Sequence, residues 1–249
     1  MTDFDLYLAL GDSMSIDFYP AADAGRDGNS GRDSIGAAAL LYENDSTLFP
    51  YFVERDLKSL LPSIKHTNLT FDGATTFDFL DPDRLKSIPS YRGKTLVTLT
   101  LGGNDLLQVI GSKARGNLVD LTKSVRELAN RYEEVLTMIR KKLPNSVVIL
   151  TTVYDPTDGT GILPTSSPLF ESALPIEYLH TFNDFVRSCA AKSPFLLADV
   201  HKHFDGHGAL CGAAEKFWYW KPSPIEPGYQ GASEIRRVWF DTLQAEKFI

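Results

Sequence analysis

Four short apolar runs constrain the fold of this chain more than any other feature of its sequence. They cover residues 4–10, 94–101, 147–153 and 195–200, and nearly every position in them is hydrophobic. Such runs are typical of strands in a parallel sheet that is covered on both faces. In a fifth run, at 64–71, apolar and polar residues alternate more, and it includes Lys65 and His66. We therefore expect this run to form a strand nearer to an edge of the sheet.

Helical patterns separate these runs. The clearest covers residues 118–143, where apolar side chains recur every three or four positions, and 47–61, 175–191 and 231–248 predict further helices. Because strands and helices alternate, the sequence predicts a three-layer α/β/α sandwich with a parallel sheet, in the flavodoxin-like style. The 249 residues show no repeat and no linker, so we expect a single domain over 1–249.

The composition limits the partners of this chain. It has 25 Lys and Arg against 32 Asp and Glu, a net charge of −7, whereas nucleic acids and anionic membranes need a basic surface. No basic N-terminal segment precedes a long apolar one, and no apolar run approaches the roughly 20 residues of a membrane span. We therefore expect a cytoplasmic protein with a small-molecule substrate, in which Cys189 and Cys211 stay reduced. Neither zinc spacing nor a phosphate-binding or dinucleotide-binding glycine motif occurs, so no metal and no cofactor are expected.

Three of the strand-like runs end in residues that can act on a ligand. The first run leads into Ser13, which brings a hydroxyl to the carboxyl edge of the sheet. Gly73, shortly after the fifth run, can offer an unobstructed backbone N–H, and Asn104, after a pair of glycines, supplies an amide donor. Ordinary structural explanations also exist, because Ser13 can cap a turn and Asp105 is expected to be the N-cap of the next helix.

A hydroxyl, a backbone N–H and a side-chain amide at one sheet edge are the parts of a serine nucleophile and an oxyanion hole. In the motifs Gly11-Asp12-Ser13, Gly73 and Gly102-Gly103-Asn104-Asp105, and in their order, the chain resembles the SGNH (GDSL-type) hydrolase superfamily over essentially its whole length. The resemblance implies a five-stranded parallel sheet and ester hydrolysis through an acyl-serine. It also implies that Ser13 is the nucleophile and that the N–H groups of Ser13 and Gly73 and the Asn104 amide bind the oxyanion.

The fourth motif of that superfamily is altered here. The superfamily ends with Asp-x-x-His-Pro and a Gly four residues after the Pro, and this chain keeps Pro227 and Gly231 in that register. Ser223 then stands at the Asp position and Glu226 at the His position. The usual base and the residue that orients it are therefore both replaced.

Three hypotheses follow for the base. In the first, Glu226 is the base, although its ordinary pKa of about 4.3 makes it weaker near pH 7 than His unless burial raises that pKa. In the second, an imidazole from elsewhere approaches, and among His201, His203 and His207 the last has the most freedom, since it lies between two glycines. In the third, the chain is a catalytically impaired relative that binds a small ligand in the retained pocket. A structural or interaction role is the remaining alternative.

Residues near these motifs are expected to shape the site. Asp12, His207 and Ser223 are the expected substrate-binding residues, and Asp12 should also brace the turn around Ser13. Other residues close in sequence to the site that can line the pocket are Asp17, Tyr19 and Tyr42. The aromatic cluster Trp218, Tyr219 and Trp220 forms either a platform for a sugar or a part of the core or a lid.

The sequence thus predicts a serine esterase that acts on a small ester, for example an acetylated one. Its expected catalytic residues are Ser13, Gly73, Asn104 and Glu226.

Overall fold

A parallel sheet of five strands forms the centre of the computed structural model, which describes residues 4–26, 34–163, 173–192 and 194–249. The strand order is β2-β1-β3-β4-β5, and every neighbouring pair is parallel. All five predicted strands are confirmed, and β2 lies at an edge as expected. The strands are β1 (Leu6–Gly11), β2 (Lys65–Asn68), β3 (Thr95–Thr100), β4 (Ser146–Thr151) and β5 (Phe195–Ala198).

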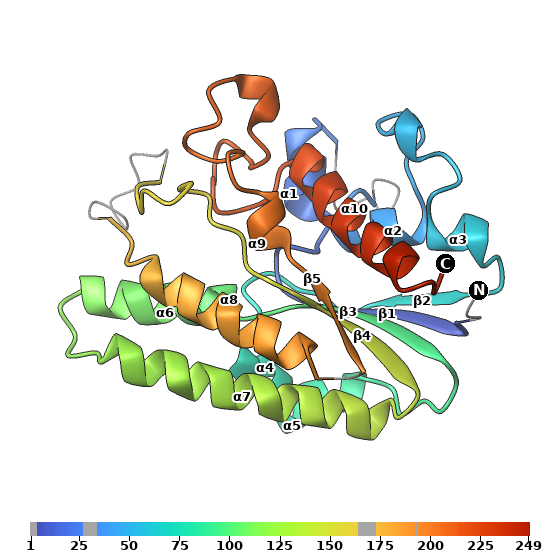
Figure 1. The fold of residues 1–249 in the computed structure, drawn as a ribbon, viewed down its shortest axis with the longest axis horizontal. Helices are drawn as coiled ribbons and strands as arrows, with labels where there is room; N and C mark the ends of the chain where they lie inside the picture. The colour runs from blue at the N-terminus through green and yellow to red at the C-terminus, as the bar shows by residue number, and fades with distance from the viewer. Residues whose placement is uncertain (1–3, 27–33, 164–172, 193) are drawn as a thin grey trace.

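Helices cover both faces of the sheet, so the predicted three-layer sandwich is confirmed (Figure 1). One layer consists of α1 (Phe18–Asp23), α2 (Ala37–Tyr42), α3 (Leu57–Leu60), α9 (Val200–His203) and α10 (Tyr229–Ala245). The other consists of α4 (Thr76–Leu80), α5 (Pro82–Ser87), α6 (Gly103–Ala114), α7 (Leu121–Lys142) and α8 (Glu177–Ala190). The described residues also form the short 3₁₀ helices η1 (Pro50–Phe52) and η3 (Ala214–Lys216).

Alternate residues of the central strands face the two layers. In β1, Tyr7 and Ala9 pack in the core on the α10 side, whereas Leu8 and Leu10 pack in the core on the α7 side. This alternation explains why the strands read as continuous apolar runs, since both faces of each strand are buried.

One predicted helix is wrong. Residues 47–61 form only η1 and α3, because the backbone turns away at Glu54, which has a φ of 59°. Asp56 then starts a new helix, since its carboxylate accepts a hydrogen bond from the Ser59 N–H at 2.8 Å. By contrast, α7, α8 and α10 lie close to their predicted ranges.

Parallel strands bring their carboxyl ends to the same edge of the sheet. The segments that begin at Gly11, Phe71, Gly102 and Thr152 all leave the sheet there. The fold therefore gathers the predicted motifs at this edge, where open α/β sheets bind their ligands. Among the described residues, none of the helices has the length and apolar character needed to cross a membrane.

Candidate active site

Ser13 lies at the tip of a tight turn after β1. Gly11 has a φ of 140°, and a side chain there would collide with the Thr100 backbone and hydroxyl. The Asp12 N–H donates to Thr100 Oγ1 at 3.1 Å, and Asp12 Oδ1 accepts from the Met14 N–H at 3.1 Å. Asp12 thus braces the turn, as expected, and Ser13 itself is 7% exposed.

Asn104 lies in the first turn of α6, beside the segment that contains Gly73. Gly102 is the N-cap of this helix and has a φ of 109°, which a residue with a side chain rarely adopts. The Asn104 amide donates from Nδ2 to the Ala74 carbonyl at 3.1 Å, which leaves its second N–H free of that bond. Because Ala74 directly follows Gly73, this bond holds the amide next to the Gly73 backbone.

Asp105 also holds the segment that follows Gly73. The prediction that Asp105 is the N-cap of α6 is wrong, because Gly102 is the N-cap. The buried carboxylate of Asp105 accepts from the Thr76 N–H at 3.0 Å and from the Thr76 hydroxyl at 2.5 Å. Arg131 of α7 donates to both Thr76 Oγ1 and Asp105 Oδ1. Burial raises the pKa of Asp105, and the hydrogen bonds from Thr76 oppose that rise. The Gly73 and Asn104 motifs are therefore joined by a buried polar network.

A cleft joins the nucleophile turn to α6 and to the altered fourth motif. Ser13, Asn104 and Glu226 all line it, so the structure brings these three predicted residues together. Gly73 and Ser223 are not among the lining residues. The remaining walls are mostly apolar and come from α6, from α8 with the segment before it, and from the segment after β4. Their residues include Leu106, Leu107, Ile110, Val153, Leu174, Ile176 and Leu179.

Glu226 is a buried carboxyl at the edge of this cleft. It is 7% exposed, and its Oε2 has no hydrogen-bond partner among the described residues. Desolvation raises the pKa of Glu226 from 4.5 to about 7, the neighbouring Ser13 side chain lowers it, and the charges of Asp72 and Asp12 raise it further. Burial likewise raises the pKa of Asp12 to about 6. The cleft therefore contains carboxyls that titrate close to neutral pH.

Backbone contacts hold the loop that carries Glu226. The Glu226 carbonyl accepts from the Trp220 N–H at 2.8 Å, and the Glu226 N–H donates to the Ser223 carbonyl at 2.9 Å. Tyr154 lies in the segment after β4, and its hydroxyl donates to the Ile225 carbonyl at 2.9 Å. Ser223 thus contributes its carbonyl to this turn, and Tyr154 is a site residue that sequence reasoning missed.

The three candidate histidines are engaged outside the cleft lining. His207 stacks on Trp218 with 3.3 Å between ring centroids, and its Nδ1 bonds to the Lys216 carbonyl at 2.8 Å. His203 Nε2 contacts Glu234 Oε2 at 2.8 Å. His201 is near His180, and burial lowers its pKa. None of these imidazoles lines the cleft.

The aromatic cluster belongs mainly to the core. Tyr219 is 1% exposed, and Trp218 packs against Phe204 as well as His207. Trp220 lies closer to the site, with its ring 5.3 Å from that of Tyr19. Tyr19 donates to Asp72 at 2.9 Å.

Two further residues that were expected to line the pocket have other contacts. Asp17 accepts a hydrogen bond from the Gly36 N–H at 2.8 Å. Tyr42 stacks on His66, away from the residues that line the cleft.

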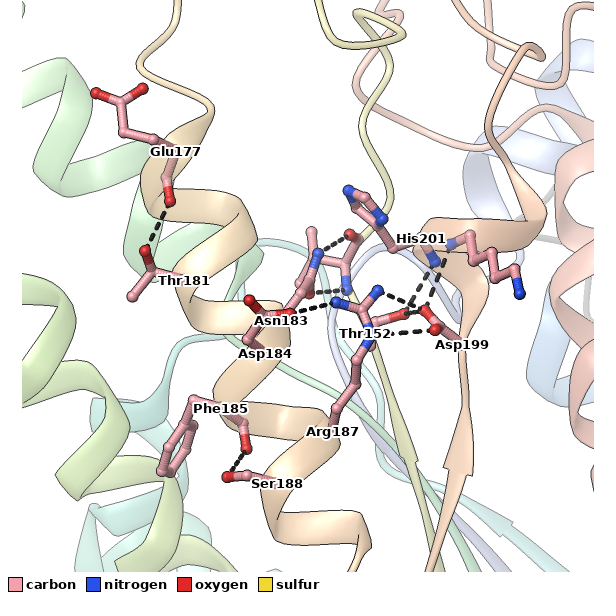
Figure 2. Close-up of polar contacts among 12 residues, drawn as sticks. Thr152, Glu177, Thr181, Asn183, Asp184, Phe185, Arg187, Ser188, Asp199 and His201 are labelled. Carbon is pink, nitrogen blue, oxygen red and sulfur yellow. Dashed lines mark hydrogen bonds and ion pairs between the residues drawn. The ribbon is translucent and has the colours of Figure 1, made fainter.

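A polar network anchors α8 to the ends of β4 and β5 (Figure 2). Asn183 is fully buried and clamps Val153, since its Oδ1 accepts from the Val153 N–H at 2.9 Å and its Nδ2 donates to the Val153 carbonyl at 2.8 Å. Arg187 pairs with Asp199 through two hydrogen bonds of 2.9 and 3.0 Å, and Thr152 donates to the same carboxylate. This network fixes the segment that carries Tyr154.

No metal-binding cluster of three or more His, Cys, Asp or Glu side chains occurs in the part of the chain that the structure describes. Cys189 and Cys211 are both free. The arrangement of Ser13, Asn104 and Glu226 is that of a hydroxyl, an amide donor and a carboxyl that can exchange a proton.

The model of the GDSL-like lipase/acylhydrolase family matches residues 9–216. No curated protein matches the chain. Solved structures with the same fold include an extracellular lipase from Streptomyces rimosus, which is 19% identical, with a TM-score of 0.56 and 96% and 98% of the two chains covered. Phospholipase A1 from Streptomyces albidoflavus is 19% identical, with a TM-score of 0.59 and coverage of 97% and 99%. The acetylxylan esterase Axe2 from Geobacillus stearothermophilus is 17% identical, with a TM-score of 0.56 and coverage of 97% and 95%.

Proposed function

Because the chain belongs to the GDSL-like lipase/acylhydrolase family, we propose that it hydrolyses small esters through an acyl-serine intermediate, with Ser13 as the nucleophile and Glu226 as the base. The observation that carries this proposal is the position of Glu226. Its carboxyl interacts with Ser13, lines the same cleft and has a pKa raised to about 7. A general base works best when its pKa lies near the working pH, because it can then both accept a proton and return it.

The first half of the reaction forms the acyl-serine. Ionised Glu226 accepts the proton of the Ser13 hydroxyl while the serine oxygen attacks the ester carbonyl. The oxyanion is stabilised by the N–H groups of Ser13 and Gly73 and by the free N–H of the Asn104 amide. When the carbon–oxygen bond to the alcohol breaks, protonated Glu226 gives its proton to the leaving oxygen.

The second half releases the acid. Water attacks the acyl-serine, Glu226 accepts its proton, and the serine oxygen is protonated again as the ester bond to Ser13 breaks. Oε2 of Glu226 makes no hydrogen bond to a described residue, so its lone pairs are available to accept a proton. A carboxylate base has no tautomer, so it does not need the second residue that selects the tautomer of a His.

The walls of the cleft favour an uncharged ester with an apolar acyl group. Leu107, Ile110, Ile176 and Leu179 are only half-buried, although they are large apolar side chains at the site. Each methylene removed from water there contributes about 0.8 kcal/mol. A butyryl or hexanoyl ester should therefore have a higher kcat/KM than the acetyl ester that the sequence suggested.

A ligand-binding protein without activity is the second candidate function. The observation in its favour is the absence of an imidazole from the described cleft lining, because Ser13 then depends on a carboxyl alone. An inert serine would leave the pocket as a binding site for the same class of small molecules.

A fluorophosphonate probe separates the two functions, because only an activated serine reacts with it. We expect a stoichiometric mass increase on the peptide that contains Ser13, hydrolysis of p-nitrophenyl butyrate, and loss of both in Ser13→Ala. A folded wild-type protein that neither reacts nor hydrolyses the ester would support the binding function and refute the enzyme.

A further inference from the structure

Tyr154 makes the one side-chain hydrogen bond in the described structure that ends on the Ile225–Glu226 peptide. Its hydroxyl donates to the Ile225 carbonyl at 2.9 Å, and the residue is 5% exposed at the wall of the cleft. Burial raises the pKa of Tyr154 well above its ordinary value, so the hydroxyl keeps its proton and remains a donor at any working pH.

The position of the Tyr154 hydroxyl is fixed from two sides. Its ring stacks on Phe204 at 5.1 Å and meets Tyr219 edge-on at 5.0 Å, with interplanar angles of 17° and 85°. The preceding residue, Val153, is clamped through both backbone groups by Asn183 of α8. A hydroxyl held in this way can hold another group in place.

The Ile225 carbonyl and the Glu226 N–H belong to the same planar peptide unit. Tyr154 binds the carbonyl of this unit, and the Ser223 carbonyl accepts from its N–H at 2.9 Å. Rotation of the unit would break both bonds and would loosen the turn that carries Glu226. Contacts at both ends of one peptide unit therefore hold the backbone from which the Glu226 side chain extends.

We propose that Tyr154 is a positioning residue, which holds the carboxyl of Glu226 beside Ser13 by binding the Ile225–Glu226 peptide. The inference rests on the proposed function of Glu226. It gives Tyr154 the task that the Asp of an Asp-x-x-His motif has, namely orienting the base, and Ser223 stands where that Asp would be.

Tyr219 offers a matched control. It is 1% exposed, packs edge-on against Tyr154, and its hydroxyl has no hydrogen-bond partner among the described residues. Tyr154→Phe and Tyr219→Phe each remove one buried oxygen from neighbouring rings. Only the first removes a hydrogen bond to the loop of Glu226.

The pH dependence of the rate reports the surroundings of Glu226. The titratable groups that interact with it are Asp12 after β1, Asp72 after β2, Tyr19 of α1 and Tyr154 after β4. The two aspartates are present in both variants, and the tyrosines stay neutral. A change of the acidic limb in Tyr154→Phe alone therefore reports changed surroundings of the carboxyls beside Ser13, Glu226 and Asp12.

The experiment compares kcat, KM and the pH profile for p-nitrophenyl butyrate in wild type, Tyr154→Phe and Tyr219→Phe. Thermal unfolding and active-serine titration correct each rate for the amount of folded protein. Loss of one neutral hydrogen bond predicts a kcat about three- to tenfold lower in Tyr154→Phe. The acidic limb should move down by about 0.5 pH unit or more, because water reaches a loosened carboxyl. Tyr219→Phe should stay within about twofold of wild type and keep its limb.

Two results would overturn the inference in different ways. If wild type is active and Tyr154→Phe keeps its corrected kcat and its acidic limb, Tyr154 only packs and the proposed function survives. If wild-type Ser13 neither reacts with a fluorophosphonate nor hydrolyses the ester, the function itself is refuted and the positioning role with it.

Discussion

Replacing Glu226 by Gln should make the protein more stable above neutral pH. Burial raises the pKa of Glu226 from 4.5 to about 7, so the folded protein binds this proton more tightly than the unfolded chain does. Stability therefore falls as the pH rises from about 4.5 to about 7 and stays level above that range. Glu226→Gln keeps the shape of the side chain and removes the charge that causes this loss.

The size of the effect follows from the two pKa values. One pKa unit corresponds to about 1.4 kcal/mol, so the rise from 4.5 to about 7 corresponds to about 3 kcal/mol at pH 8. At pH 5 the difference between the two proteins should be below about 1 kcal/mol. For a chain of this length, about 3 kcal/mol raises Tm by about 6 to 12 °C.

The assay is thermal unfolding of wild type and Glu226→Gln at pH 5 and pH 8. Glu234→Gln is the matched control, since burial opposes ionisation there too but hydrogen bonds from His203 and Arg237 lower the pKa of Glu234. The same chemical change should destabilise the protein at that position. Equal Tm values for wild type and Glu226→Gln at pH 8, or a lower Tm for the variant, would refute a desolvated carboxyl at Glu226.

Two further substitutions test the rest of the site. Asn104→Ala should lower kcat by about 10²–10³, because it removes an oxyanion donor, and an unchanged rate would make Asn104 only the partner of Ala74. His207→Ala should keep the kcat of wild type while lowering Tm, because the ring stacks on Trp218 outside the cleft lining; loss of activity with an intact fold would revive the imidazole hypothesis.

The sequence was sufficient to predict the sheet and the meeting of Ser13, Asn104 and Glu226 at one cleft, since the signals are local. Near-continuous apolar runs identify buried parallel strands, and a Gly at or just after the end of a strand indicates a turn that residues with a side chain rarely adopt. Gly11 and Gly102, with φ values of 140° and 109°, are both of this kind. Ser13 and Asn104 then had to lie at one edge of the sheet.

Interactions between distant segments could not be read in the same way. Asp105 looks like an N-cap beside Gly103, yet its carboxylate binds Thr76 and Arg131. Tyr154 bonds to a carbonyl 71 positions later, and no local pattern announces that contact. Its place directly beyond a strand end was nevertheless a usable signal, because Ser13 and Asn104 occupy corresponding places.

The sequence could predict a raised pKa for Glu226 only if this residue is buried. The register with Pro227 and Gly231 puts a carboxyl at the base position, and only burial makes it an effective base near pH 7. Whether that carboxyl is buried depends on the loop held by Trp220 and Tyr154 and on the closeness of Asp12 and Asp72. These are properties of the assembled edge of the sheet.

The rate at which a fluorophosphonate labels Ser13, measured against pH, tests the pairing of Ser13 with Glu226 most directly. The probe needs only the nucleophile and its base, so the substrate does not enter the result. The labelling rate of wild type should rise as Glu226 ionises, with the midpoint of the rise near pH 7. The labelling rate of Glu226→Gln should be lower by about 10²-fold or more and should not show this rise. Labelling of Glu226→Gln at the wild-type rate and with the wild-type pH dependence would show that Glu226 is not the base.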